Sequence, residues 1–281
     1  MRRVLVVALF VVIFLVGLSV MLYPMVSDLL NSQKHTQAID QYFQLIENMS
    51  PQEFEELFRA AREYNERLLG KPNRFNMTDE DLAEYKSLLN PIGMDLIGTL
   101  EIEVIDIHLP IYHGTDEGVL QAGLGHLEGT SLPIGGPSTH SVITGHRGLP
   151  SSTLLQNLDR IIAGDIFKIN VLNEALIYRV DQVTIVEPHE TSALAIISDG
   201  DYCTLVTCTP YSINTHRLLV RGYRVSIDDV EEYVRPTRIP SEARLLSSAM
   251  ASLIIIVPTA IVILVVLFIR LRRVYGRGKK R

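Results

Sequence analysis

Two long runs of residues without charge set the first limit on what this chain can fold into. Residues 4–27 and residues 245–269 contain no Asp, Glu, Lys or Arg, and each run is long enough for the roughly 20 residues with which a helix crosses a bilayer. Basic residues flank both runs on the side of the nearer terminus. Because cytoplasmic flanks collect positive charge, we expect two membrane spans, with both termini inside the cell and residues 28–244 outside.

A cleaved signal peptide is the alternative for the first run, because Arg2 and Arg3 followed by an apolar stretch also fit that pattern. No Ala-x-Ala cleavage site follows, and the apolar run continues to Tyr23, which favours an uncleaved anchor. The second run has no such alternative, and Pro258 in its middle is tolerated in a membrane helix. The basic tail after it suffices as a stop-transfer signal, although it is also able to contact anionic lipid.

The charges between the two runs are mainly acidic. Nine of the 26 Lys and Arg residues lie outside residues 24–269, whereas all 32 Asp and Glu residues lie inside this range, which therefore carries a net charge of −15. Such a surface repels phosphate and argues against a nucleic-acid partner. The cysteines are Cys203 and Cys208, too few for a disulfide scaffold or a Cys-rich zinc site.

Helices are expected at the start of the exported part. Between residues 36 and 69, apolar residues recur at spacings of three and four, as amphipathic helices require. The sequence Ser50-Pro51-Gln52-Glu53 is typical of a capping box with proline at the first helical position, so a second helix is expected to begin there. Residues 70–80 predict an irregular loop. A short helix over residues 79–89 is expected after it.

From residue 98 onwards the pattern changes to the alternation that is typical of β-strands. Apolar and polar residues alternate from residue 100 to residue 107. Many short strands separated by Gly- and Pro-bearing connections favour a closed or nearly closed, antiparallel-rich barrel over alternating β-α-β units. The further strand-like runs lie over residues 141–144, 166–171, 175–186, 203–208 and 218–227, with one helical stretch expected at roughly 152–162.

Cys208 is the strongest candidate for chemistry. Pro210 follows closely and cannot continue a central strand, so we expect Cys208 at the rim of the barrel, with its side chain directed by the strand behind it. Cys203 lies five residues earlier, an odd separation that points its side chain to the opposite face of the strand. We interpret Cys203 as a small core residue and expect no disulfide. The alternative for Cys208 is that it, too, is a buried structural cysteine.

A thiol nucleophile needs a neighbour that favours the thiolate. His146 is the best placed histidine, because it follows the strand-like run 141–144 and is flanked by glycines, which places it at another strand end. The alternative is a turn histidine without a partner. The loop histidines with weaker contexts are His113, His126 and His140.

Arg217 is the second candidate partner. If the chain turns back through residues 210–214 and pairs antiparallel with the cysteine strand, Arg217 lies near Cys208. Its neighbour His216 then faces the other way, so only one of the two reaches the site. A fixed guanidinium there is able to hold a substrate carbonyl or to stabilise an oxyanion. A surface arginine without such a role is the alternative.

Three segments, taken together, resemble sortases. Residues 204–211, which read Thr-Leu-Val-Thr-Cys-Thr-Pro-Tyr, and residues 214–222 resemble the active-site segment of that family. Residues 141–150 resemble its histidine segment, and residues 98–102 resemble its opening barrel strand. The resemblance covers residues 98–227. The two apolar runs, the helical N-terminal extension and the basic tail resemble class C, the pilin-polymerising sortases of Gram-positive bacteria.

The resemblance implies a mainly β fold: a sortase-type closed β-barrel with short helices, an N-terminal helical extension and two transmembrane helices. The implied domains are a transmembrane helix over residues 1–27, the helical extension with a lid-like loop over 28–97, the catalytic barrel over 98–230, a linker over 231–244, a second transmembrane helix over 245–269 and a cytoplasmic tail over 270–281.

The lid-like loop departs from the class C pattern. These sortases usually carry Asp-Pro-aromatic over the cysteine, whereas this sequence reads Lys71-Pro72-Asn73-Arg74-Phe75.

The resemblance also implies a transpeptidase with Cys208, His146 and Arg217 as catalytic residues. Cys208 would attack the Thr–Gly carbonyl of a Leu-Pro-x-Thr-Gly-type sorting signal and form a thioester, His146 would protonate the departing amine, and Arg217 would position the signal and the oxyanion. A lysine amine of the next pilin subunit would then resolve the thioester.

The implied partners are pilin subunits that carry a sorting signal and the lipid bilayer, without cofactor, metal or nucleic acid. The implied location is the cell membrane, with the catalytic domain outside. Three alternatives stay open: a sortase that anchors proteins to the cell wall, a membrane-tethered thiol protease, and a tethered binding module in which Cys208 is inert.

Overall fold

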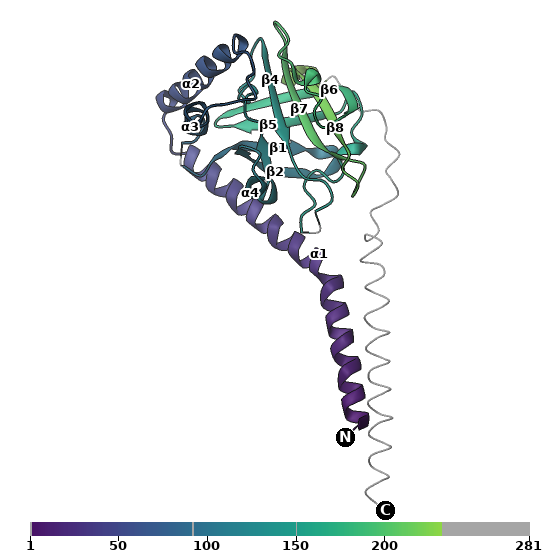
Figure 1. Ribbon diagram of the computed structural model, residues 1–281. Coiled ribbons are helices and arrows are strands. Elements are labelled where there is room, and N and C mark those ends of the chain that lie inside the picture. The colour runs from purple at the N-terminus through teal and green to yellow at the C-terminus, as the bar shows by residue number, and fades with distance from the viewer. Residues whose placement is uncertain (1, 92, 150, 232–281) are drawn as a thin grey trace, which may run out of the picture. The chain divides into compact units, whose positions relative to one another are not determined.

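Eight strands close into one barrel in the order β1-β2-β3-β4-β7-β8-β6-β5 (Figure 1). The computed structural model describes residues 2–91, 93–149 and 151–231. The prediction of a mainly β, closed barrel with short helices is therefore confirmed. The predicted second transmembrane helix and the cytoplasmic tail lie outside the described residues. The strands are β1 (Leu96–Ile102), β2 (Ile107–His113), β3 (Leu124–His126), β4 (Thr139–Thr144), β5 (Ile166–Val171), β6 (Glu174–Val186), β7 (Asp201–Thr209) and β8 (His216–Val225).

Most neighbouring strands run antiparallel, but β2 pairs with β3, and β4 with β7, in parallel. The parallel pairing of β4 and β7 has a direct consequence for function. Both strands point the same way, so their C-terminal ends meet at one edge of the barrel. Strand β8 pairs antiparallel with β7 and therefore begins at that same edge.

Two sequence predictions for the strands are wrong in detail. The strand expected from residue 100 to residue 107 is broken by the short 3-10 helix η1 (Glu103–Ile105), which is followed by Asp106 at φ +56°. An aspartate tolerates this left-handed conformation and so permits the tight turn into β2. The last predicted strand stops at Val225, because Ser226 then begins the helix α5 (Ile227–Glu231) by accepting a hydrogen bond from Asp229 N at 3.2 Å.

The helices agree with the pattern in the first third of the chain and differ later. The predicted capping box begins α2, with Ser50 Oγ accepting from Glu53 N at 3.3 Å and Glu53 Oε2 accepting from Ser50 N at 2.7 Å. The helix expected at roughly 152–162 is wrong, since only the short 3-10 helix η2 (Leu158–Arg160) forms there. The other helices are α1 (Arg2–Ile46), α2 (Pro51–Leu69), α3 (Asp79–Ser87), α4 (Glu117–Ala122) and the 3-10 helix η3 (Ser192–Leu194).

The segment after β4 forms separate turns in place of a helix. Gln156 N donates to Thr153 O at 2.9 Å and Leu158 N donates to Leu155 O at 3.1 Å, a three-residue spacing that an α-helix does not use. The segment is attached to α1, because the backbone N–H and the hydroxyl of Thr153 both donate to Asp28 Oδ1, at 2.7 and 2.6 Å.

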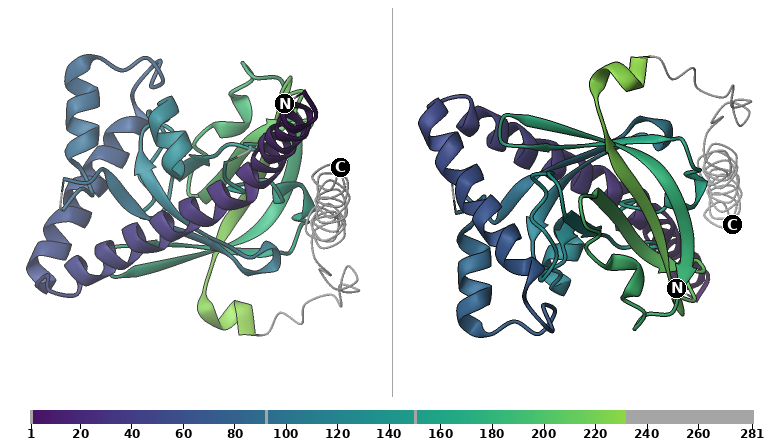
Figure 2. Two further views of the ribbon diagram at one scale, coloured as in Figure 1. Left: turned by 90° about the horizontal axis from the view of Figure 1, so that it is seen from below. Right: turned by 90° about the horizontal axis from the view of Figure 1, so that it is seen from above.

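Helix α1 has two different halves. Its N-terminal half projects from the barrel (Figure 1) and exposes its large apolar side chains, whereas its C-terminal half crosses the outside of the barrel (Figure 2). Tyr42 fastens the second half, because its buried hydroxyl donates to Ile97 O at 2.9 Å and accepts from Leu172 N at 2.7 Å. Among the described residues, one helix is long and apolar enough to cross a membrane, over Leu9–Ile46.

The helical extension shares its core with the barrel. Helices α2 and α3 lie together at one side of the barrel (Figure 2), and their buried side chains, including Tyr64, Leu68 and Tyr85, belong to the same apolar cluster as the strand residues. The side chain of Asn65 pairs with both backbone groups of Leu132, at 3.1 and 2.7 Å. The extension is therefore packed as part of the catalytic unit and is not a separate appendage.

Candidate active site

The edge of the barrel at which β4 and β7 end and β8 begins carries Cys208. This residue is the second-last of β7 and is half-buried, and Pro210 directly follows the strand. Cys203, five residues earlier on the same strand, is fully buried, and burial raises the pKa of its thiol well above the usual value. Neither cysteine forms a disulfide. The predicted opposite orientation of the two side chains is confirmed, and only Cys208 reaches the surface.

Arg217 lies directly across from Cys208. The register of β7 and β8 pairs Cys208 with Arg217 and Thr209 with His216, and side chains at such paired positions stand on the same face about 5 Å apart at Cβ. The Arg217 guanidinium donates through Nη1 to the carbonyls of Asn214 and His216, at 3.3 and 3.1 Å. The predicted antiparallel return of the chain is confirmed, and of the two neighbouring candidates it is Arg217 that faces the cysteine.

His146 occupies the equivalent place on the other side of Cys208. Thr144, the last residue of β4, pairs with Val206 of β7. The register continues beyond the strand end, because Gly145 N donates to Val206 O at 3.1 Å and Thr207 Oγ1 donates to Gly145 O at 2.8 Å. Two residues beyond the Thr144 pair, the position of His146 lies beside that of Cys208. The position of Cys208 on β7 is therefore flanked by that of Arg217 on β8 and by the chain that leaves β4 toward His146.

The imidazole of His146 has one buried ring nitrogen, Nε2, that faces a carboxylate. It makes no hydrogen bond of good geometry among the described residues. The nearest carboxylate oxygen is Glu117 Oε1, 3.5 Å away and too poorly placed for a hydrogen bond. Glu117 begins α4, and its pKa is lowered, first by the hydrogen bond from Gln121 and then by the charge of His146. Sequence reasoning missed Glu117, because the six residues of α4 are too few for a periodic signal.

Comparison with known proteins decides the family. A family model of the sortase domain matches residues 100–225. Among solved structures, sortase C1 of Streptococcus agalactiae is 46 % identical, with a TM-score of 0.66 over 68 % of this chain and 98 % of that one. The chain belongs to the sortase family.

Two further relatives agree with this assignment. Sortase C of Streptococcus pneumoniae is 45 % identical, with a TM-score of 0.62 over 68 % of this chain and 97 % of that one. Sortase D of Bacillus subtilis is 28 % identical over 154 residues, which are 54 % of this chain and 74 % of the relative. Sortases are cysteine transpeptidases, and several of the similar solved structures are class C sortases.

An apolar cluster on the outer face of this sortase runs from the active-site edge to η3. Val206 and Leu219 stand on the same face as the paired Cys208 and Arg217, two residues from each. They pack with Val142 of β4 and with Leu194, the last residue of η3. His140 fastens the segment after η3, because one ring nitrogen lies 2.8 Å from Ala195 O and the other 2.7 Å from Thr204 Oγ1. Burial lowers the pKa of His140, and both of its ring nitrogens lie in structural contacts.

The lid-like loop of the sortase is attached to this same segment. The Arg74 guanidinium donates to Leu194 O at 2.6 Å and lies 4.9 Å from the Phe75 ring centroid, and burial lowers its pKa. The loop backbone also lies close to Gly129, where φ is +77° and an added Cβ atom would come within 2.2 Å of Arg74 O. The Phe75 ring itself stays 42 % exposed. The loop is therefore held by Arg74 rather than by an inserted aromatic ring.

The other candidate histidines lie away from the cysteine. His126 is fully buried, with Nδ1 2.9 Å from the Tyr85 hydroxyl and Nε2 2.9 Å from Ser131 O, and burial lowers its pKa to about 3. His113 lies with its ring nitrogens near the carbonyls of Asp95 and Leu88, at 3.1 and 2.7 Å. Both have their ring nitrogens engaged in structural contacts.

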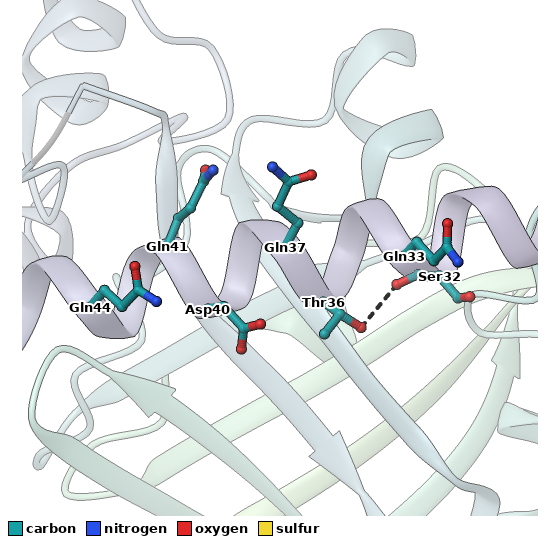
Figure 3. Close-up of a pocket in the computed structure, with 7 residues that line it drawn as sticks. All are labelled: Ser32, Gln33, Thr36, Gln37, Asp40, Gln41 and Gln44. Atoms are coloured by element: carbon teal, nitrogen blue, oxygen red, sulfur yellow. Dashed lines mark hydrogen bonds between the residues drawn. The ribbon is translucent and has the colours of Figure 1, made fainter.

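Two hollows on the surface lie along α1 and lack the chemistry of the active-site edge. The first, of about 470 Å³, is lined by Ser, Thr, Gln and one Asp and is drawn in Figure 3, where Thr36 donates to the carbonyl of Ser32. The second, of about 670 Å³, lies between α1, the start of α2 and the β5–β6 connection. Neither contains Cys, His or Arg. In residues 2–91, 93–149 and 151–231, no group of three metal-binding side chains is close enough to hold an ion.

Proposed function

We propose that this sortase cleaves a Leu-Pro-x-Thr-Gly-type sorting signal between Thr and Gly and joins the acyl group to a lysine of another pilin subunit. The proposal rests on one observation: β8 pairs Arg217 with Cys208 at the barrel edge where β4 ends, two residues before His146. The similarity to class C sortases supports the choice of substrate, since the similar sortase C of Streptococcus pneumoniae acts on pilin.

In the first half-reaction, the Cys208 thiol gives its proton to His146, and the resulting thiolate attacks the carbonyl carbon of the threonine. The carbonyl π electrons move to oxygen, and Arg217 stabilises this oxyanion, because two backbone carbonyls engage only Nη1 and leave its other donors available. The C–N bond to glycine then breaks and the thioester forms. His146 gives its proton to the departing amine, a role that suits an imidazole whose Nε2 has no tight protein hydrogen bond and lies 3.5 Å from Glu117 Oε1.

In the second half-reaction, a lysine amine replaces glycine as the nucleophile. The amine attacks the thioester carbonyl, His146 takes up the proton that the amine loses, and Cys208 departs as the thiolate. An isopeptide bond joins the two subunits. Water in place of the amine would make the same site a thiol protease, and a peptidoglycan amine would make it a wall-anchoring sortase.

We also propose that the protein acts at the cell membrane with its barrel outside. The apolar, projecting half of α1 supports an anchor there. The orientation of the termini and the second span remain predictions from the charge pattern, because residues 245–269 lie outside the described part of the chain.

The test uses the full chain in detergent micelles with a purified pilin that carries a sorting signal. Mass spectrometry of the intact protein should find an acyl adduct on Cys208, and polymer ladders should grow with time. The C208A variant should give neither, whereas the matched control C203A, which removes the buried thiol of the same strand, should give both. An adduct on C208A, or release of hydrolysed pilin alone in the presence of acceptor lysines, would contradict the proposal.

A further inference from the structure

The side chain next to His146 has no part in the chemistry described so far, yet it is almost completely buried. The side chain of Arg147 is only 8 % exposed. Its Nε donates to Gln156 O at 3.2 Å, one terminal nitrogen donates to Thr209 Oγ1 at 3.4 Å, and the other donates to Asp159 Oδ2 at 2.6 Å. We propose that Arg147 is a positioning residue that holds His146 against the Cys208 end of β7.

The three acceptors of Arg147 belong to different segments. Gln156 lies in the irregular segment after β4, Asp159 in η2, and Thr209 is the last residue of β7. Arg147 directly follows His146 in the chain, and Thr209 directly follows Cys208. The bond between Arg147 and Thr209 therefore links the residue next to the proposed base with the residue next to the proposed nucleophile.

Backbone contacts make His146 dependent on this link. Before it, Gly145 is bound to β7, and the carbonyl of His146 itself accepts from Leu155 N at 3.2 Å. Beyond His146 the chain leaves the sheet, and the Arg147 side chain reaches back to the strand. The Nε2 atom of His146 lies 3.5 Å from a carboxylate oxygen of the exposed Glu117, a contact too long to fix the ring by itself. The position of the ring then follows the position of its backbone.

The loop that connects Cys208 to Arg217 also contacts Arg147. The Arg147 guanidinium carbon lies 6.0 Å from the ring centroid of Tyr211, in the loop that leads from Cys208 to Arg217. Gly148, at φ +87°, lets the chain turn under this ring, since a Cβ atom there would lie 3.2 Å from it. Arg147 thus contacts the segments that carry each of the three proposed catalytic groups.

Only an arginine fits this arrangement. Its planar guanidinium presents donors in a fixed fork, whereas the ammonium of lysine is a single point on a flexible stem. A lysine at this position keeps the charge near Asp159 but cannot reach Gln156 O, Asp159 and Thr209 at once. Replacement by lysine therefore separates the effect of geometry from the effect of charge.

The inference rests on the proposed Cys208–His146 pair, so its test begins without a substrate. The rate of Cys208 alkylation by iodoacetamide is measured against pH for the full chain in micelles and for H146A, R147K, R147Q and T209V. The buried Cys203 thiol and the C208A variant give the background. Arg221, a partly buried arginine paired with Asp181 at 2.7 Å on the same sheet, supplies the control variant R221Q.

We expect R147K and R147Q to move the alkylation profile toward that of H146A, and R221Q to leave it unchanged. With a sorting-signal peptide, both Arg147 variants should lower kcat by about tenfold or more with KM within about twofold, because a small misplacement of a catalytic group slows the reaction more than it weakens binding. T209V, which removes one hydroxyl at constant shape, should show a smaller effect of the same kind, and it carries the test if the Arg147 variants do not fold.

Three results would overturn the inference, and they are distinguishable from failure of the proposed function. If H146A changes the profile but R147Q and T209V match the unchanged protein, the pair stands and the role of Arg147 is wrong. If R147K keeps full activity while R147Q loses it, the positive charge of residue 147 is required and the guanidinium geometry is not. If H146A itself matches the unchanged protein, the Cys208–His146 pair fails, and the positioning role fails with it.

Discussion

The replacement of His126 by glutamine should make this sortase less sensitive to acid. His126 is fully buried, with Nε2 2.9 Å from Ser131 O and Nδ1 2.9 Å from the Tyr85 hydroxyl. A carbonyl oxygen only accepts, so the neutral ring donates from Nε2. A second proton on Nδ1 would place a positive charge in the core, and burial accordingly lowers the pKa of His126 to about 3.

The size of the effect follows from linkage. In the unfolded chain the histidine titrates at roughly pH 6.5. Because the folded pKa is the lower one, the stabilising contribution of the neutral ring is complete above roughly pH 6.5 and is lost as the pH falls from there toward 3. Each pH unit in this window costs about 1.4 kcal/mol, so the step from pH 7.5 to pH 4.5 removes about 3 kcal/mol of the free energy of unfolding. Since pH 4.5 lies well above the folded pKa, the loss depends almost entirely on the unfolded value.

The assay is urea unfolding of the full chain in micelles, followed by circular dichroism at both pH values. The unchanged protein should lose about 3 kcal/mol more than H126Q between them, whatever the absolute stability of the variant. The other titrating groups, including the buried His113 and His140, are present in both proteins and cancel in this difference. Equal pH dependence of the two proteins would refute the reasoning, because it would mean that His126 is protonated at no cost in the folded state.

Three further predictions concern other parts of the molecule. G98A should cost at least about 2 kcal/mol in urea unfolding, because a Cβ atom at Gly98 would come within 2.2 Å of Asn170 O on β5, whereas G118A, in α4 with open space around it, should not destabilise the protein. R74A removes the bond to Leu194 O, so hydrogen exchange in residues 71–77 should accelerate; unchanged protection would show that Arg74 does not hold the loop. R217A should lower kcat about 100-fold, as loss of an oxyanion donor does, while Cys208 remains open to alkylation; a full rate with peptide would remove Arg217 from the mechanism.

The placement of Cys208 and Arg217 could be predicted from local patterns alone. Strand alternation assigned Cys203 to the core and Cys208 to the outside, and Pro210 fixed where the strand stops. Arg217 followed from a hairpin, in which register depends on a short turn. These are short-range features, and the sequence of one hairpin contains all of them.

The neighbour of Cys208 on the other side could not be predicted in this way. His146 reaches the cysteine through the parallel pairing of β4 and β7, which lie more than fifty residues apart in the chain. A parallel register has no turn to define it. The short strand β3 and the helix α4 gave no periodic signal, and buried polar residues such as His113 and His126 weaken the apolar pattern of the strands that contain them. The residue pattern favoured His146 over the other candidate histidines because it follows a strand end, and the resemblance to sortases then assigned its role beside Cys208.

The whole site depends on the register of one central strand. β7 pairs with β4 on one side and with β8 on the other, and a slip of one residue turns every side chain to the opposite face. Such a slip would bury Cys208 in the barrel and would separate Thr207 from Gly145 O, which it contacts at 2.8 Å. The inward position of Cys203 and Leu205 opposes that slip, because both are fully buried and would be forced to the outer face. The apolar residues that stabilise the barrel are thus also the residues that keep the thiol between its two partners.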